Sequence, residues 1–300
     1  MYDSISFIRP DGIEINLCNY YGDRTLYELI GRKGFEAPPL NYTDIIYAHG
    51  FSKTVAIRVN PRDVVLQMIV IGNSTLQRDT ILHQLVKDLT ISGSVGTTGK
   101  LKIMRSNGKS VYLNCWYTGG IESIVEQYVK FHKFQLTFHA ADPYFYDTID
   151  TTYSAQDTEQ KGLLLGTNTF LGLDVFLSGT KAGITKNVVN DGVITYPIIT
   201  VTGPAKNIWF TNEATGKTIK MKPAFELKAN ENLVIDTREG QRSVTLIVGG
   251  ESTDVIGSLS VESSLIWELV PGNNNIIVHI SDVTPATLTE FSFTKKYLSA

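Results

Sequence analysis

The sequence predicts a mainly β protein in two parts: an α+β N-terminal domain with one helix, followed by an antiparallel β-sandwich. Residues 134–146 read FQLTFHAADPYFY, an alternating strand that stops at an Asp-Pro pair. Residues 190–203 read NDGVITYPIITVTG and open a new series of strands after an Asn-Asp-Gly turn. Apolar residues recur at helical spacing only over residues 74–89. Together these observations place one helix before the first boundary and strands after the second.

The chain has 300 residues, which suits two domains because single hydrophobic cores rarely grow beyond this length. We expect an N-terminal domain over residues 1–146, a Thr-, Ser- and Gly-rich connector over 147–189, and the sandwich over 190–300. Hydrophobic residues make up 42% and charged residues 19% of the chain, as in ordinary globular proteins.

The N-terminal domain is expected to contain two hairpins and the helix. The segment SISFIRPDGIEINL alternates on both sides of a Pro-Asp-Gly turn, and an Asn-Gly pair at 107–108 separates two further alternating runs. In the helix, Leu82, Leu85, Val86 and Leu89 form the apolar stripe, and Asn73 or Ser74 is the N-cap.

A long insertion, at about residues 19–52, is expected to be an irregular loop. It contains several glycines and prolines and seven aromatic residues: Tyr20, Tyr21, Tyr27, Phe35, Tyr42, Tyr47 and Phe51. Irregular loops of this length are unusual inside a compact domain. Two interpretations stay open, since an aromatic loop can wrap its own core or serve as an arm that packs on a neighbouring subunit.

The second half reads as strand after strand with turns at regular spacing. The expected strands are 194–201, 207–212, 218–221, 233–236, 244–248, 265–269, 276–280 and 288–295. Pro197 lies inside the first of them, which predicts an edge position because proline lacks the amide that a central strand must donate.

No catalytic, cofactor-binding or metal-binding residue can be assigned. The sequence lacks phosphate-loop, dinucleotide, nucleophile-elbow and zinc-protease motifs, and its five histidines have no ligand-like spacing. The net charge of -3 does not favour nucleic acid as a partner. Cys18 and Cys115 are expected to be free thiols in a reducing cytoplasm, and neither a signal peptide nor a membrane span is expected.

Two tryptophans of the second half are the best candidates for a contact surface. Trp209 and Trp267 both lie in apolar strands, so a core position is the favoured interpretation for each. The alternatives are stacking on a sugar ring, with a tyrosine such as Tyr196 nearby, or contact with a neighbouring subunit.

The order of these segments resembles the distal tail protein family of long-tailed phages with non-contractile tails. The resemblance is carried by VVLQMIVIG with the helix TLQRDTILHQLVKDL, the hairpin GKLKIMRSNGKSVYLNC, the strand FQLTFHAADPYFYD, and in the second half by NDGVITYPIITVTGPAKNIWFTNEATGKTI, ENLVIDTREG and LVPGNNNIIVHI. It is weakest at residues 19–50 and 147–185.

This resemblance implies a structural virion protein without enzymatic activity or cofactor. The N-terminal domain would form a homo-hexameric ring at the tail tip, between the tail tube protein and the tail-associated hub or lysin protein, and DNA would only pass through the lumen. The C-terminal sandwich would have a galectin-like or carbohydrate-module-like topology and hold receptor-binding or side-fibre proteins. The protein would be made in the host cytoplasm and act in the virion. The alternative is a carbohydrate-binding adhesion module that recognises the host cell surface.

Overall fold

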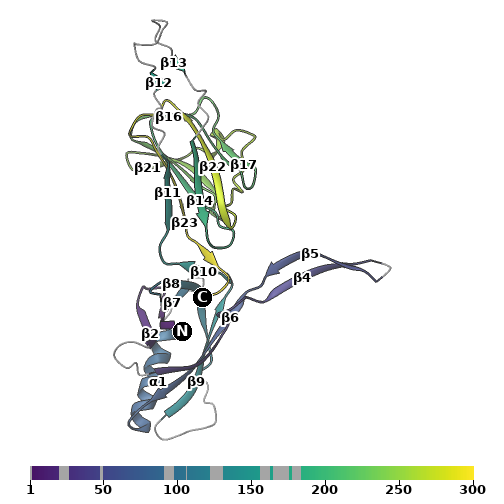
Figure 1. Ribbon diagram of the computed structural model, residues 1–300. Coiled ribbons are helices and arrows are strands. Elements are labelled where there is room, and N and C mark those ends of the chain that lie inside the picture. Colours follow the sequence, from purple (N-terminus) through teal and green to yellow (C-terminus); the bar gives the residue numbers. More distant parts are fainter. Residues whose placement is uncertain are drawn as a thin grey trace. The chain divides into compact units, whose positions relative to one another are not determined.

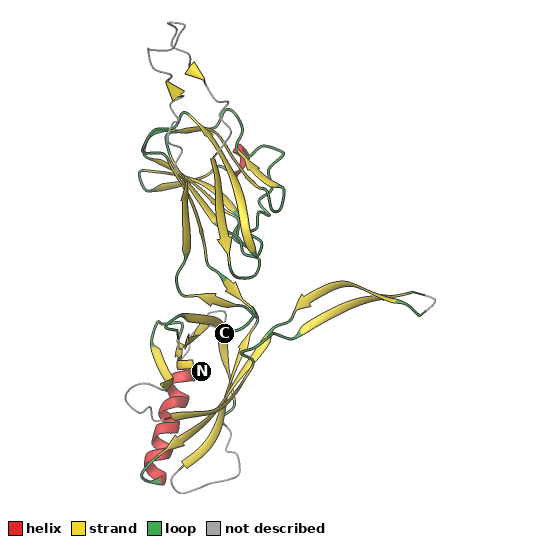
Figure 2. Cartoon of the chain, in the orientation of Figure 1, coloured by secondary structure: helices red, strands yellow, loops and turns green. Residues whose placement is uncertain are grey.

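The chain is mainly β, with one α-helix and one 3-10 turn among the residues described (Figures 1 and 2). The computed structural model describes residues 2–19, 27–47, 50–90, 98–105, 107–121, 131–155, 163–164, 176–177 and 184–300. They form two compact units, the first made of Met1–Thr148 with Lys296–Ala300 and the second of Ile149–Lys295.

The first unit is built on one antiparallel sheet. Its main path runs in the order β2 (Glu14–Asn19), β1 (Tyr2–Ile8), β7 (Gly99–Arg105), β8 (Ser110–Gly119), β9 (Phe131–Ala140), β6 (Arg62–Ile71) and β3 (Tyr27–Lys33). Two short strands extend it, since β10 (Phe145–Asp147) pairs with both β8 and β24 (Lys296–Tyr297). The last residues of the chain therefore belong to the first unit.

Helix α1 (Thr75–Thr90) begins at the predicted cap. The Ser74 hydroxyl accepts a hydrogen bond from the Gln77 amide at 3.2 Å, and the Gln77 side-chain oxygen accepts one from the Asn73 amide at 2.8 Å. Ile81, Leu85 and Leu89 are buried, and Leu82 is partly buried against the same core. The stripe thus lies about one residue off the predicted one, because Ile81 replaces Val86 on the buried face.

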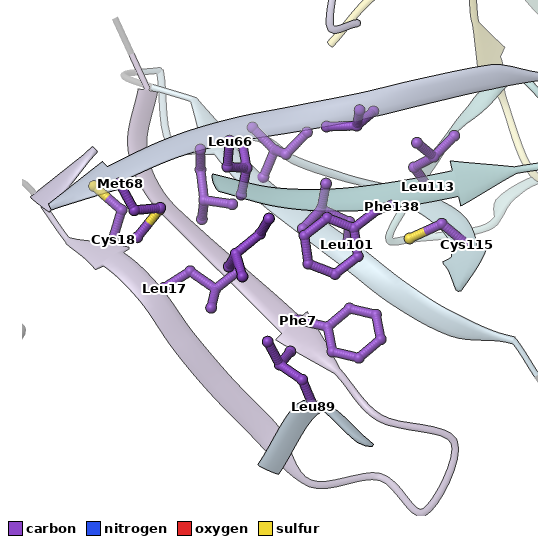
Figure 3. Close-up of a cluster of buried hydrophobic side chains, with 14 of the residues drawn as sticks. Phe7, Leu17, Cys18, Leu66, Met68, Leu89, Leu101, Leu113, Cys115 and Phe138 are labelled. Carbon is purple, nitrogen blue, oxygen red and sulfur yellow. The ribbon is translucent and has the colours of Figure 1, made fainter. Parts of the chain in front are cut away.

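The buried residues of α1 belong to the core of the first unit, together with buried residues of the sheet (Figure 3). Phe134, Leu136 and Phe138 are fully buried, as the alternation of β9 predicts. Both cysteines are free and buried here, and burial raises the pKa of the Cys115 thiol to about 12. Cys115 is therefore an inert core residue.

The second unit contains two antiparallel sheets. The six-stranded sheet runs β11 (Thr151–Ala155), β23 (Leu288–Phe293), β15 (Ile198–Thr202), β19 (Glu231–Asp236), β20 (Ser243–Val248) and β21 (Glu251–Asp254). The five-stranded sheet runs β14 (Ile184–Asn190), β22 (Gly272–Ser281), β16 (Ala205–Asn212) and β17 (Lys217–Lys220), with β18 (Glu226–Leu227) also paired to β16. A separate pair, β12 (Leu163–Leu164) with β13 (Phe176–Leu177), completes the described strands.

The two sheets share one hydrophobic core, which makes this unit a β-sandwich. Phe210 of one sheet meets Phe291 of the other edge to face, with ring centroids 5.8 Å apart. Val201 and Ile235 of the first sheet and Ile276 of the second are fully buried in the same cluster. The antiparallel sandwich is thus confirmed, whereas its galectin-like topology stays a prediction.

Several local expectations were wrong. No strand forms at 265–269, where only Leu269 pairs, in an isolated bridge with Thr195. The loop expected at residues 19–52 contains β3, β4 (Leu40–Ile46) and the start of β5 (Ser52–Val59), because its β-branched and aromatic residues pair as strands; its residues 20–26 and 48–49 lie outside the described residues. The expected connector 147–189 contributes β11 and β14 to the second unit. Its residues 156–162, 165–175 and 178–183 also lie outside the described part.

Pro197 does not mark an edge strand. β15 begins only at Ile198 and is a central strand between β23 and β19. Pro197 avoids the ladder by preceding it, and its carbonyl accepts hydrogen bonds from the Thr237 amide and hydroxyl at 3.3 and 2.6 Å.

Candidate functional site

The most unusual surface of the first unit is a hairpin, here called the arm, formed by β4 and β5 with the turn between them. The arm is a two-stranded sheet of its own (Figure 1). Every residue of β4 is exposed, including Ile46 at 78%, and Phe51 in the turn is 74% exposed. The remaining exposed apolar residues are Leu40, Tyr42, Ile45, Tyr47, Val55 and Ile57. The arm therefore presents apolar side chains to solvent along its whole length.

Both faces of the arm carry these apolar residues. Near its base, Tyr42 lies opposite Ile57 and Leu40 opposite Val59, so one face is apolar there. The pairing register shifts between Thr43 and Asp44. Toward the tip, alternation along β4 places Ile45 and Tyr47 on the face opposite to Tyr42. A surface that covers only one face of the arm would leave the other face exposed.

An isolated two-stranded hairpin is marginally stable in water, because it has no sheet face or helix to bury its side chains against. Exposed apolar patches of this kind mark contact sites in soluble proteins. The arm is thus the strongest candidate for an assembly interface among the described residues, and it lies inside the segment for which the sequence left the arm interpretation open.

The root of the arm, meaning residues 34–39 and 60–62, is tightly built. Gly34 has φ +89°, and a Cβ atom there would lie 2.2 Å from the Asp63 carbonyl oxygen, so only glycine fits. The Asn60 amide donates to the Pro39 carbonyl at 2.9 Å and closes the base of the hairpin. The exposed arm therefore starts from an ordered base.

The structure rules out a contact role for Trp267. Its side chain is fully buried in the sandwich core, where the ring stacks on Phe291 at 6.2 Å and Nε1 donates to the Lys217 carbonyl at 3.0 Å. A ring without solvent exposure cannot meet a sugar or a neighbouring subunit. The core interpretation of this tryptophan was correct.

Trp209 lies on the outer surface of the five-stranded sheet and is half-buried. Its neighbours on the two adjoining strands are His279 and Lys220. The His279 ring stacks on the indole with centroids 4.2 Å apart and 21° between planes, and the Lys220 Nζ lies 5.1 Å from the indole centroid. Because the two partners approach from strands on opposite sides, the ring faces are covered and the ring edge is what Trp209 presents.

Tyr196 lies immediately before β15 of the six-stranded sheet, so it does not share a surface with Trp209. Partial burial, and then the neighbouring Glu239 that accepts its hydroxyl hydrogen bond, raise the pKa of Tyr196. The structure therefore does not bring the three residues suggested by the sequence into one site.

A further aromatic row lies on the first unit. Trp116 of β8, exposed to 36%, stacks on His139 of β9 at 6.3 Å, and His139 Nδ1 lies 2.7 Å from the Asp63 carboxylate of β6. Asp142 is the acid nearest to His139 along the chain, but it is not this partner. The actual partner is 76 positions away in sequence, and only strand register brings it close.

Nothing in the described residues resembles a reaction centre. No group of three or more His, Cys, Asp or Glu side chains within them is arranged to hold a metal ion. Among the helices described, none combines the length and the apolar character needed to cross a membrane.

Residues 192–297 match the family model of the siphovirus-type tail component, C-terminal domain. Residues 192–297 are therefore similar to the C-terminal domain of siphovirus-type tail components. The match spans most of the sandwich of the second unit and ends within β24. A search of curated protein sequences found no match.

Solved structures resemble this chain along nearly its entire length. The Dit protein of phage SPP1, described as a paradigm of the hub adsorption apparatus in phages that infect Gram-positive bacteria, has a TM-score of 0.62 at 16% identity and covers 98% of this chain and 99% of its own. A chain of the phage P2 baseplate in its activated conformation with calcium has a TM-score of 0.50 at 10% identity, with 100% of both chains covered. Identities this low establish a common fold, which includes both units of this chain.

Proposed function

We propose that this chain is a siphovirus-type tail component and serves as the distal tail hub, a structural protein that forms a homo-hexameric ring at the tip of the tail. The proposal is supported by the tail component domain over residues 192–297 together with the fold that the chain shares with the SPP1 hub protein along both units. No catalytic step is part of this function.

The arm is the observation that carries ring formation. Apolar side chains on both of its faces require cover from more than one side, and neighbouring copies of the chain in a ring can supply it. A ring closes when one surface of each subunit meets a different surface of the next and the rotation between them returns to the start. In this proposal the arm supplies one of those surfaces.

The ring would lie between the tail tube protein and the tail-associated hub or lysin protein, with DNA passing only through its lumen. The second unit would hold receptor-binding or side-fibre proteins. The phage P2 chain that shares the fold is part of a baseplate, which supports assembly of this kind. Synthesis would take place in the host cytoplasm and function in the virion.

Solution mass tests the ring. Multi-angle light scattering of the purified chain at micromolar concentration is expected to give a mass near six chains, and negative-stain images of the same peak should show rings. A double variant that makes the arm polar, Ile46→Ser with Phe51→Ser, should shift the mass toward a monomer because both side chains are among the most exposed apolar groups of the arm.

Val261→Ser is the matched control, since Val261 is a fully exposed apolar residue of the second unit. This variant should keep the mass of the unmodified chain. A monomeric unmodified chain, or an arm variant that still forms rings, would contradict the proposal.

Carbohydrate recognition remains the alternative function, and the half-exposed Trp209 is the observation that favours it. Sugar rings normally stack on a tryptophan face, but His279 and Lys220 lie over the faces of this indole. A sugar would therefore have to displace Lys220. A glycan array probed with the purified chain tests this, and binding that is lost in Trp209→Ala would establish it.

A further inference from the structure

The chain passes between its two units twice, and the same pair of strands marks both passages. β10 ends at Asp147, just before the chain enters the second unit at Ile149, and β24 starts at Lys296, just after the chain leaves it at Lys295. These strands pair with each other, Phe145 with Tyr297 and Tyr146 with Lys296. The two passages are thus joined by a ladder that belongs to the first unit.

Beyond β24 the last residues of the chain run to the root of the arm. The Ala300 amide donates to the Phe35 carbonyl at 2.9 Å. The Leu298 carbonyl accepts a hydrogen bond from Arg62 Nη2 at 2.7 Å. The C-terminal residues therefore contact both segments that form the root, the one that leads into β4 and the one that follows β5.

Arg62 connects these segments through a single side chain. It is 2% exposed, and its Nη1 donates to the carbonyls of Gly34 at 3.1 Å and Glu36 at 3.0 Å. The guanidinium also lies 4.8 Å from the centre of the Phe145 ring, so it touches β10 as well. Burial lowers the pKa of Arg62, but the guanidinium stays charged at any physiological pH.

The contacts of Arg62 are of a kind that lysine cannot reproduce. A guanidinium holds several donors in a rigid plane, and here they reach carbonyls on the root and on the C-terminal residues at once. Because the acceptors of these three hydrogen bonds are main-chain carbonyls, the bonds fix the positions of the backbone and not of side chains. The arrangement suits a residue whose task is to hold three segments of backbone in one relative position.

We propose that Arg62 is the positioning residue of the arm and that residues 298–300 act as its latch. The direction in which the arm leaves the sheet is then set by the strand pair through which the chain enters and leaves the second unit. The part of this inference that concerns ring closure rests on the proposed function; the fixing of the root does not.

Hydrogen exchange at the Asn60 amide tests the latch directly, because that amide closes the base of the hairpin. The variants are a chain that ends at Tyr297, Arg62→Met and Arg62→Lys. In the first two, exchange at Asn60 is expected to accelerate by about tenfold or more relative to the unmodified chain. Arg62→Lys should fall between, since it keeps the charge but cannot reach three carbonyls.

The Ile103 amide of the main sheet serves as the internal reference and should exchange at an unchanged rate in every variant. Arg242→Met removes the same charge from an exposed site of the second unit and should leave Asn60 unaffected. If Asn60 exchanges at the same rate with and without residues 298–300, the latch does not exist. If Arg62→Met fails to fold, the shortened chain and Arg62→Lys still decide the question.

Light scattering of the same samples separates this inference from the proposed function. Faster exchange at Asn60 together with loss of rings supports both. Faster exchange in the variants, when the unmodified chain itself never forms rings, supports the latch and contradicts the ring. Unchanged exchange in a chain that does form rings overturns the latch and leaves the ring in place.

Discussion

Asn274 shows how a single buried polar residue organises the sandwich. Its side chain is fully buried, and its amide nitrogen donates to the carbonyls of Val188, Val270 and Gly272 at 3.4, 2.8 and 3.2 Å. Its amide oxygen accepts from the Val270 amide at 3.0 Å and from Asn212 at 3.1 Å. One side chain therefore links the ends of β14, β16 and β22 to the segment that precedes β22.

We predict that Asn274→Ala lowers the free energy of unfolding of the second unit by about 2–4 kcal/mol, because it leaves several buried partners without hydrogen bonds. Urea denaturation monitored by tryptophan fluorescence measures this free energy of unfolding, since Trp267 lies in the core of the second unit. The neighbouring Asn273 bonds only to Asn187 at an exposed site, and Asn273→Ala should change stability by less than about 0.5 kcal/mol. Equal effects of the two variants would contradict the role of the buried network.

Because His132 is buried, we predict that the stability of the first unit depends on pH. The residue is buried on β9, and burial, followed by the nearby Arg78, lowers its pKa in the folded chain. The unfolded chain then binds a proton more readily than the folded chain. Stability should therefore be lost as the pH falls from about 6.5, the ordinary histidine value, toward the lowered folded value.

The measurement is the unfolding temperature of the first unit between pH 5.5 and 7.5, for the unmodified chain and for His132→Gln. The unmodified chain should lose stability at the acidic end, and the variant should lose less of it. Identical pH profiles would show that another group governs acid sensitivity.

At the scale of residues, the sequence predicted burial where it depends on local alternation. It missed side-chain contacts that depend on strand register. The burial of Phe134, Leu136 and Phe138 follows from the period of one strand. The partners of Trp209 and His139 come from other strands, at separations that no local pattern encodes. The burial of Trp267 was predicted from the apolar run that contains it, whereas its stacking on Phe291 was not.

At the scale of elements, a substitution at the N-cap of α1 can measure how much that residue contributes to stability. We predict that Ser74→Ala destabilises the first unit by about 1 kcal/mol, since the Ser74 hydroxyl satisfies the Gln77 amide at the open end of the helix. Thr80→Ala is the control: its hydroxyl bonds to the Leu76 carbonyl inside the same helix, so alanine should be neutral or slightly stabilising. Thermal unfolding of both variants provides the comparison.

The turn after β7 shows why element type was easier to predict than geometry. The hairpin of β7 and β8 forms as expected, and Gly108 has φ +76°. The loop is longer than a two-residue turn, because the Arg105 amide is bonded to the Lys109 carbonyl and the Gly108 amide to the Arg105 carbonyl.

The arm escaped prediction because its strands have no buried face. Sequence patterns reveal a strand when apolar and polar residues alternate, and they alternate when one face is covered within the same chain. In the arm, Ile46 follows Leu40 and Tyr42 on one face while Ile45 lies on the other, so the segment reads as irregular.

At the scale of the whole molecule, the boundaries of the units follow strand pairing and not composition. Residues 147–189 are poor in apolar residues, yet β11 and β14 lie there and pair with β23 and β22. Both lie at the outer ends of their sheets, where one side of the strand is unpaired. Edge strands need fewer apolar residues than central ones, which is why composition alone made the segment look like a connector.

This arrangement predicts how the second unit behaves as a fragment. A fragment of residues 149–295 retains every strand of both sheets and should unfold in one cooperative transition. A fragment of residues 190–295 lacks β11 and β14, which uncovers Phe293 and Ile276, both buried in the intact unit. Each large buried side chain that becomes exposed costs roughly 1.5–3 kcal/mol, so the shorter fragment should have little or no stable fold.

Circular dichroism during thermal unfolding of the two fragments and of the full chain decides this. The longer fragment should reproduce one transition of the full chain at a similar temperature, because its core is complete within residues 149–295. The shorter fragment should melt at much lower temperature or not cooperatively. Equal stability of the two fragments would mean that β11 and β14 are not needed for the stability of the sheets. The sandwich would then begin at residue 190, as composition suggests.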